Sequence, residues 1–135
     1  MNRSLQISET VATVDNPYII AEMGTNHDRE LQTARELIDA AADAGVDAVK
    51  YQIFHGEDIV TDTISPAQYG LDEYYDETSI IQIYNNHLRL PRKWFTELVD
   101  YANERGIDNI ATVSCADCAQ FVADSGVDAL KIASM

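Results

Sequence analysis

Apolar residues along the chain form short continuous runs separated by stretches with a helical period. The continuous runs predict four buried strands, over residues 18–22, 46–53, 109–113 and 127–133. The helical spacing predicts three main helices, over residues 28–44, 91–105 and 117–125, each followed by a glycine. Strands that alternate with helices in this way indicate an α/β fold with a parallel sheet and right-handed crossovers.

Four strands and three helices amount to the first half of a (β/α)8 barrel of the TIM type, with an open flavodoxin-like sheet as the rival fold. The 135 residues predict one domain, whereas a closed barrel usually needs roughly 250 residues. We expect a polar lead-in over 1–16, with a short strand near 11–14, and the half-barrel over 17–135. Residues 54–90 form a long connection with a short helix near 79–84, and such connections are usually functional.

One short segment occurs twice. Gly-Val-Asp-Ala-Val-Lys at 45–50 is echoed by Gly-Val-Asp-Ala-Leu-Lys at 126–131. The chain has only three lysines, Lys50, Lys93 and Lys131, and two of them end these repeated strands. This placement predicts a specific use for positive charge at one edge of the sheet, although a lysine exposed at each strand end by coincidence is the alternative.

The overall charge is strongly negative. With 23 acidic and 9 basic residues the net charge is −14, which argues against binding nucleic acid or an anionic membrane through bulk electrostatics. The acid-rich, lysine-poor composition suggests salt adaptation, a hypothesis that full stability in low salt would count against. No run of about 18 apolar residues and no signal-peptide pattern is present, so a cytoplasmic protein is expected.

Polar residues collect where the predicted strands end, and in parallel folds that edge carries the site. Two ammonium groups suit a phosphate or carboxylate, hydroxyls complete its hydrogen bonds, and a nearby glutamate can move a proton. A purely structural pairing of that glutamate with a lysine is the alternative. The residues at this edge are Glu22, Asn26, His27, Lys50, Gln52, His55, Thr112, Ser114, Cys115, Lys131 and Ser134.

Cys115 and Cys118 form a Cys-x-x-Cys pair, which can be a redox motif or half of a zinc site. No second cysteine pair exists to complete a four-cysteine site, so two ordinary reduced cysteines are expected. His55 and His87 lie in or beside the long connection without an evident neighbouring ligand. We therefore predict no complete metal site in this chain.

Three segments carry a family resemblance. Residues 19–27, Ile-Ile-Ala-Glu-Met-Gly-Thr-Asn-His, resemble the I-A-E-x-G-x-N-H opening of the sialic acid synthase family. Residues 34–52 are similar to that family's A-x-x-L-I-D-A-A-x-x-A-G-x-D-A-V-K-F-Q segment, and 131–134 to its K-I-x-S segment. The resemblance spans residues 17 to 134, and its first segment is the most specific.

The resemblance implies a transferase that condenses phosphoenolpyruvate with an N-acetyl hexosamine of the N-acetylmannosamine type. The products are a nine-carbon sialic-type acid and phosphate, and the family uses a divalent metal, manganese or magnesium. Matched by position, Glu22 is the implied catalytic carboxylate. Asn26 and His27 are expected as possible supporting residues that do not contact the substrate themselves. The implied substrate contacts are Lys50 and Lys131 for phosphoenolpyruvate, Gln52 for the sugar, and the hydroxyls of Thr112 and Ser134.

The chain also departs from the family pattern. Asp28 and Arg29 stand where the family usually has a glycine, and Met135 comes before the family's next Gly-Glu. Strands five to eight, two metal-binding histidines and a C-terminal antifreeze-like domain are missing. We therefore expect a chain that is inactive alone and that self-associates or pairs with a missing half.

Three alternatives stay open. The first is a non-catalytic half-barrel that binds an anionic ligand or a complementary half. The second is a legionaminic or pseudaminic acid synthase, because these enzymes share the same motifs and the sequence does not select the sugar. The third is a synthase of octulosonate or heptulosonate phosphates, which the I-A-E-x-G-x-N-H opening disfavours.

Overall fold

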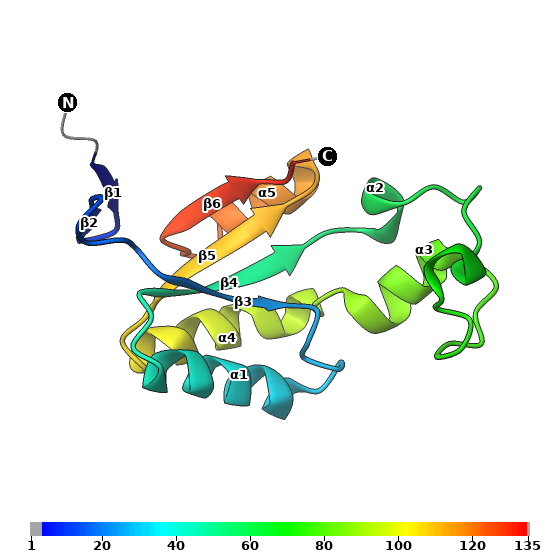
Figure 1. Ribbon diagram of the computed structural model, residues 1–135, viewed down its shortest axis with the longest axis horizontal. Helices are drawn as coiled ribbons and strands as arrows, with labels where there is room; N and C mark the ends of the chain where they lie inside the picture. The colour runs from blue at the N-terminus through cyan, green and yellow to red at the C-terminus, as the bar shows by residue number, and fades with distance from the viewer. Residues whose placement is uncertain (1–3, 135) are drawn as a thin grey trace.

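The computed structural model describes residues 4–134 and contains a parallel sheet covered by helices on one face (Figure 1). The sheet has the order β3-β4-β5-β6, with strands Ile20–Gly24, Ala48–Ile53, Asp108–Val113 and Ala129–Ile132. The covering helices are α1 (Leu31–Asp43), α4 (Arg92–Glu104) and α5 (Ala116–Ala123). The predicted order of strands and helices is confirmed, with element ends that differ by one to three residues.

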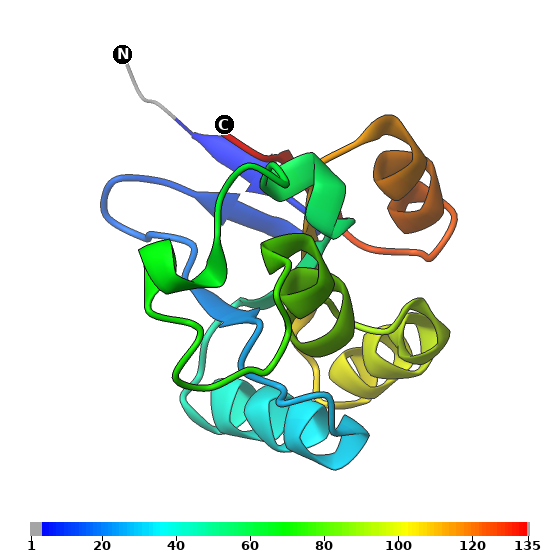
Figure 2. The same cartoon turned by 90° about the vertical axis from the view of Figure 1, so that its right-hand side faces the viewer.

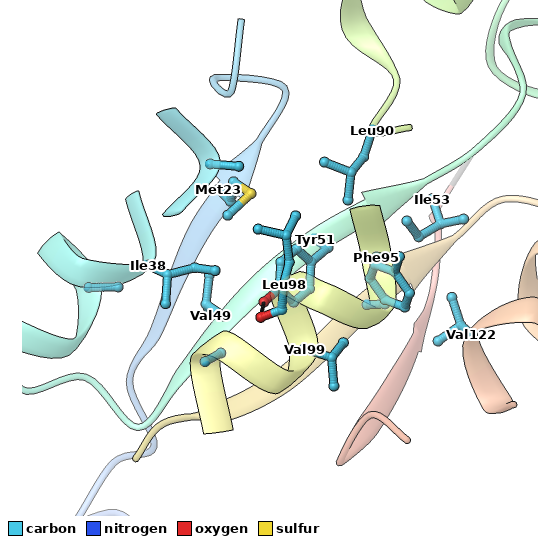
Figure 3. Close-up of a cluster of buried hydrophobic side chains, with 14 of the residues drawn as sticks. Met23, Ile38, Val49, Tyr51, Ile53, Leu90, Phe95, Leu98, Val99 and Val122 are labelled. Atoms are coloured by element: carbon cyan, nitrogen blue, oxygen red, sulfur yellow. Dashed lines mark hydrogen bonds between the residues drawn. The ribbon is translucent and has the colours of Figure 1, made fainter. Parts of the chain in front are cut away.

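The hydrophobic core lies between the sheet and these helices (Figure 3). Val49, Tyr51 and Ile53 alternate along β4 and are all buried against the helices, because successive side chains of a strand point to opposite faces. The Tyr51 ring meets Phe95 of α4 edge to face, and its hydroxyl donates to Asn109 Oδ1 at 2.9 Å. The opposite face of the sheet is therefore left for polar side chains.

Each of the three helices ends at a glycine in the left-handed region. Gly45, Gly106 and Gly126 have φ values of 74°, 75° and 76°. A residue with a Cβ is strained in this conformation, so glycine sets the sharp turn from helix into strand. The predicted helix over 117–125 begins one residue earlier than expected because Cys115 caps it, accepting a hydrogen bond from the Cys118 N–H.

The aspartate of the repeated segment makes an equivalent hydrogen bond in both copies. Asp47 accepts a hydrogen bond from the Ile19 N–H at 2.6 Å, and Asp128 accepts one from the Asn109 N–H at 2.8 Å. Each carboxylate thus fastens the start of its strand to the preceding strand. A third, weaker copy at 106–109, Gly-Ile-Asp-Asn, was not recognised from the sequence, and its Asp108 accepts from a tyrosine hydroxyl instead.

The connection over 54–90 is more ordered than predicted, with short helices at the carboxyl end of the strands (Figure 1). These are α2 (Gly56–Ile59), a 3₁₀ turn (Pro66–Tyr69), α3 (Ile80–Ile83) and a π turn (Tyr84–Leu88). The short helix expected near 79–84 is confirmed as α3.

A single asparagine holds the two ends of this connection together. Asn85 accepts from the Gly56 N–H at 2.9 Å and donates to Glu57 at 3.0 Å. A Cβ on Gly56 would lie 2.7 Å from the Ile81 carbonyl oxygen, so only glycine fits between α2 and α3. The start and the end of the connection are thus packed directly against each other.

The lead-in forms a small antiparallel hairpin rather than a single strand. Its strands are β1 (Leu5–Ile7) and β2 (Thr10–Ala12), where one strand near 11–14 was expected. Residues 1–3 and 135 lie outside the described part of the chain, and the division at residue 16 stays a prediction. Among the helices within residues 4–134, none has the length and apolar character needed to cross a membrane.

Candidate active site

The strand register brings the predicted site residues onto one face of the sheet. Glu22 of β3 is paired with Lys50 of β4, while Gln52 is paired with Thr112, and Thr112 with Lys131. These residues alternate with the buried core positions of their strands, so their side chains point away from the helices. Figure 2 views the molecule with the end that carries α2 and α3 facing the reader, and this is the end where the strands terminate.

Glu22 and Lys50 form an ion pair on this face. The Lys50 ammonium lies 3.0 Å from Glu22 Oε2, with 19% of the lysine side chain and 42% of the glutamate side chain exposed. The other carboxylate oxygen accepts from the Gly24 N–H at 3.0 Å. Gly24 has a φ of 57°, a left-handed conformation that glycine adopts without strain and that turns the chain into the loop after β3. The carboxylate is thus held in place while it stays open to a ligand.

A cavity of ≈ 200 Å³ lies at the ends of β4, β5 and β6, and Gln52, two residues after Lys50 on the same face of β4, is among its lining residues. Four of the predicted residues line it together with the neighbouring hydroxyl of Ser114, whose oxygen is buried and has no hydrogen-bond partner. Within residues 4–134, the Lys131 ammonium makes its hydrogen bond to the Ile132 carbonyl oxygen, at 3.4 Å. The lining residues are Gln52, Ile53, Phe54, Ile59, Thr112, Ser114, Lys131, Ala133 and Ser134.

Ser114 therefore joins the candidate site on structural grounds. The sequence placed it at the correct edge but offered no reason to prefer it over its neighbours. A buried hydroxyl and an ammonium that have no side-chain partner within the described residues suit a small anionic ligand, because both can donate hydrogen bonds to it.

Asn26 and His27 lie in the loop after β3 and hold that loop in shape. Asn26 donates to the Met23 carbonyl oxygen at 3.0 Å, and the buried His27 accepts from the Arg29 N–H at 3.1 Å. Burial lowers the pKa of His27, which therefore stays neutral, and its ring lies edge to face with Trp94 of α4. A supporting role behind Glu22 stays a prediction for both residues.

Asp28 and Arg29 occupy left-handed backbone positions, with φ values of 50° and 57°. This explains why the related pattern usually has glycine here, since glycine adopts this conformation without strain. The Arg29 guanidinium compensates by donating to the carbonyl oxygens of Asn85 and Arg89 at 3.2 and 3.3 Å. The loop after β3 is thereby tied to the end of the long connection.

A second polar cluster lies at the same end of the sheet. His55, Asp58, Cys115 and Cys118 each offer a ligand atom, and these four atoms all lie within 4.8 Å of one another. The sequence analysis did not recognise that His55 and Asp58 lie beside the cysteine pair, and its prediction that this chain holds no complete metal site stays a prediction. Both cysteines are free, and burial raises the pKa of the Cys115 thiol to about 11.

The cluster could have been found from the strand register alone. Ile53 of β4 is paired with Val113 of β5, which places His55 beside Cys115, two residues farther along each strand. The sequence distance between the two segments hides this relation, and only a correct pairing of the strands reveals it.

Known proteins resemble this chain over nearly its whole length. The chain is 36% identical over 132 residues to the spore coat polysaccharide biosynthesis protein SpsE of Bacillus subtilis. This match covers 97% of this chain and 34% of that protein. The chain is also 34% identical over 117 residues to N,N'-diacetyllegionaminic acid synthase of Legionella pneumophila, covering 87% of this chain and 33% of that protein. The chain thus spans about a third of the length of the curated relatives it matches.

The crystal structure of an N-acetylneuraminic acid synthetase from Leptospira borgpetersenii, in complex with citrate, matches the fold. It superposes with a TM-score of 0.73 at 25% identity, over 98% of this chain and 41% of that chain. The predicted fold class, the first strands and helices of a TIM-type barrel, is confirmed. Residues 37–135 also match the NeuB family, so the resemblance noted in the sequence is confirmed and the chain belongs to the NeuB family.

Proposed function

We propose that this chain provides the phosphoenolpyruvate-binding part of the active site of a sialic-acid-type synthase. The reaction joins C3 of phosphoenolpyruvate to the carbonyl carbon of an N-acetyl hexosamine, water adds at C2, and phosphate leaves. The observation that carries this proposal is the polar row on the open face of the sheet. Lys131 lines the cavity, and Lys50, which is paired with Glu22, lies two residues before the cavity residue Gln52 on the same face of β4.

The spacing of the two lysines suits a ligand with two anionic ends. Lys50 and Lys131 lie on β4 and β6, two strand spacings apart, and the register places Lys131 two residues farther along the sheet, so their Cα atoms are about 12 Å apart. Flexible four-carbon side chains let both ammonium groups converge on one small ligand. One end of phosphoenolpyruvate is a phosphate and the other a carboxylate, and the hydroxyls of Thr112, Ser114 and Ser134 can complete their hydrogen bonds.

Glu22 gains a second role when the anion binds. In the free protein its carboxylate is engaged by Lys50 at 3.0 Å. A phosphate that takes over Lys50 releases one carboxylate oxygen, while the Gly24 N–H keeps the other in position. Glu22 can then accept or return a proton at the sugar, within reach of the newly formed bond. Gln52, one step along the same face of β4, is placed to hydrogen-bond the sugar.

Members of the NeuB family are generally metal-dependent, and a manganese or magnesium ion would polarise the sugar carbonyl when bound. The residues described here do not fit such an ion at this edge. Hard divalent cations need several oxygen ligands, and Glu22, already engaged with Lys50, is the carboxylate this row offers. The four-residue cluster with two sulfurs is a softer ligand set. No step is therefore assigned to a metal.

Further polypeptide is needed to complete the site. The relatives are about three times as long as this chain, and within residues 4–134 strands β3 and β6 each have a neighbour on one side only. We therefore propose that a second polypeptide segment pairs with these edges and supplies the remaining groups. The acceptor proposed first is of the N-acetylmannosamine type, and the relative that makes legionaminic acid favours its sugar as the second candidate.

The test is phosphoenolpyruvate binding by isothermal titration calorimetry on three lysine variants. Lys50→Met and Lys131→Met should each weaken binding by about tenfold or more, because each removes a charge-assisted contact of about 1.5–3 kcal/mol. Lys93→Met is the matched control, since Lys93 is the only other lysine and lies on α4 beside a separate surface pocket. Equal effects of all three variants, or no binding at millimolar ligand, would contradict the proposal.

A further inference from the structure

The cluster of His55, Asp58, Cys115 and Cys118 combines ligands from two separate parts of the chain. His55 and Asp58 lie at the end of β4 and on α2, and the cysteines lie at the start of α5. The ligand atoms are all within 4.8 Å of one another. A tetrahedral zinc ion with bonds of about 2.0–2.3 Å needs its ligands roughly 3.3–3.8 Å apart. The two cysteine sulfurs, which lie 2.6 Å apart, would therefore have to separate, and the most distant pairs would have to move closer.

The burial of the ligand atoms also favours a bound cation at this cluster. One oxygen of Asp58 is buried without any hydrogen-bond partner, and Cys118 is fully buried in the core. A buried carboxylate oxygen without a donor is unfavourable unless a cation or proton meets it. The Cys118 N–H already donates to Cys115 Sγ at 3.2 Å, an interaction that stabilises a thiolate.

The surroundings supply the second layer that metal ligands usually have. His55 lies 3.3 Å from the Asp117 carboxylate, the common companion of a metal-binding histidine. Arg92 donates to Asp117 at 2.6 Å and approaches Cys118 Sγ at 3.6 Å. Two thiolates, one carboxylate and a divalent ion sum to a charge of −1, and the Arg92 guanidinium offsets it.

We propose that these four residues form a zinc site that joins α2 to the start of α5. Sulfur and imidazole ligands in a four-coordinate set select zinc over magnesium or manganese, and the two thiols release their protons as they bind. This site is distinct from the proposed anion cavity but adjoins it, because Ile59 follows Asp58 and Ser114 precedes Cys115 in the cavity wall. Zinc would therefore hold one wall of that cavity in place.

The experiment is a cobalt titration of the reduced, metal-free chain under anaerobic conditions. One Co²⁺ per chain should bind, with a thiolate-to-cobalt charge-transfer band and the visible bands of tetrahedral coordination, and Zn²⁺ should displace it. His55→Gln and Asp58→Asn should each weaken binding by more than the roughly 10–100-fold that loss of an outer-shell partner costs. His87→Gln is the matched control, because that histidine pairs with Glu77 outside the cluster.

Two results would overturn the proposal. One is the absence of a tetrahedral spectrum in the reduced chain, including the case where the cysteines simply oxidise to a disulfide. The other is binding that Cys118→Ser abolishes but His55→Gln and Asp58→Asn leave unchanged, which means an adventitious dithiol. Circular dichroism checks that each variant is folded, and both non-cysteine variants change residues that are partly exposed. Slower alkylation of the cysteines in the presence of Zn²⁺ provides a second readout that does not depend on cobalt.

Discussion

Strands β4 and β6 begin with the same repeated sequence segment but lie in different surroundings. In β4, Val49 and Tyr51 are 1% and 0% exposed, whereas the matching Leu130 and Ile132 of β6 are 37% and 72% exposed. Lys50 is ion-paired with Glu22, whereas the ammonium of Lys131, within the part of the chain that the structure describes, donates to a backbone carbonyl oxygen.

The difference shows that the repeated segment fixes the course of the backbone but not how deeply the strand's side chains are buried. Glycine, aspartate and lysine place the turn, the first hydrogen bond and the charged side chain in the same way in both copies. Burial depends on the neighbours, and β4 has a strand on both sides while β6 has β5 alone within the described chain. The exposed apolar residues of β6 agree with the proposal that further polypeptide covers this edge.

The largest expected effect is the difference between the contributions of β4 and β6 to stability. Tyr51→Ala should lower the free energy of unfolding by about 3–5 kcal/mol, because it removes a buried aromatic ring and leaves a cavity. Ile132→Ala, at the matching position, should change it by less than about 0.5 kcal/mol. Urea titrations followed by circular dichroism measure both. A loss of several kcal/mol for Ile132→Ala would mean that β6 is covered in solution, for example by a second copy.

Tyr51→Phe refines this test. The ring stays, but Asn109 Oδ1 loses the donor that it has at 2.9 Å in the buried core. We expect a loss of about 1–3 kcal/mol, the usual effect of an unsatisfied buried polar group. If Tyr51→Phe were as stable as the parent chain, a water molecule or another donor would have to replace the hydroxyl.

A smaller and more equal effect is expected from the two repeated aspartates. Asp47→Ala and Asp128→Ala each remove a charged acceptor from a backbone N–H, which should lower the free energy of unfolding by about 1–3 kcal/mol. Asn at either position keeps the acceptor and should recover most of the loss. If Asp128→Ala were as stable as the parent chain while Asp47→Ala were destabilised, the Asp128 hydrogen bond would not be what holds the start of β6.

The smallest effect concerns the two lysines in the absence of substrate. Lys50→Met should change the free energy of unfolding by less than about 1 kcal/mol, because its partner Glu22 is well exposed and solvent screens the pair. Lys131→Met should leave stability unchanged. The Lys50 difference should shrink further in 1 M salt, where charges are screened within about 3 Å. A large loss for either lysine would indicate a structural role and weaken the proposed binding role.

The strand and helix order could be predicted because its signals are local. Periodicity, the glycines after each helix and the alternation along β4 are all visible within short windows of sequence. The sequence also predicted the edge at which Glu22, Lys50 and Gln52 lie, and the strand register places them on one face there. The roles assigned to these residues stay predictions, because they depend on a ligand and not on the backbone.

The parts that were missed depend on contacts between distant segments. His55 meets Cys115 only because Ile53 pairs with Val113 across two strands that lie 60 residues apart in sequence. Ser114 stands out only once its hydroxyl is seen to be buried without a partner. The lead-in hairpin was reduced to one strand because its two short strands carry too little periodic signal.

The asparagine that joins the two ends of the long connection has a consequence for engineering. Because Asn85 bonds to both Gly56 and Glu57, the chain enters and leaves this region at nearly the same point. The 27 residues between Glu57 and Asn85 form a loop whose ends are held together, and the entropy of closing a loop changes only slowly with its length. A peptide tag or a small domain inserted near residue 72 would therefore extend this loop without moving the sheet.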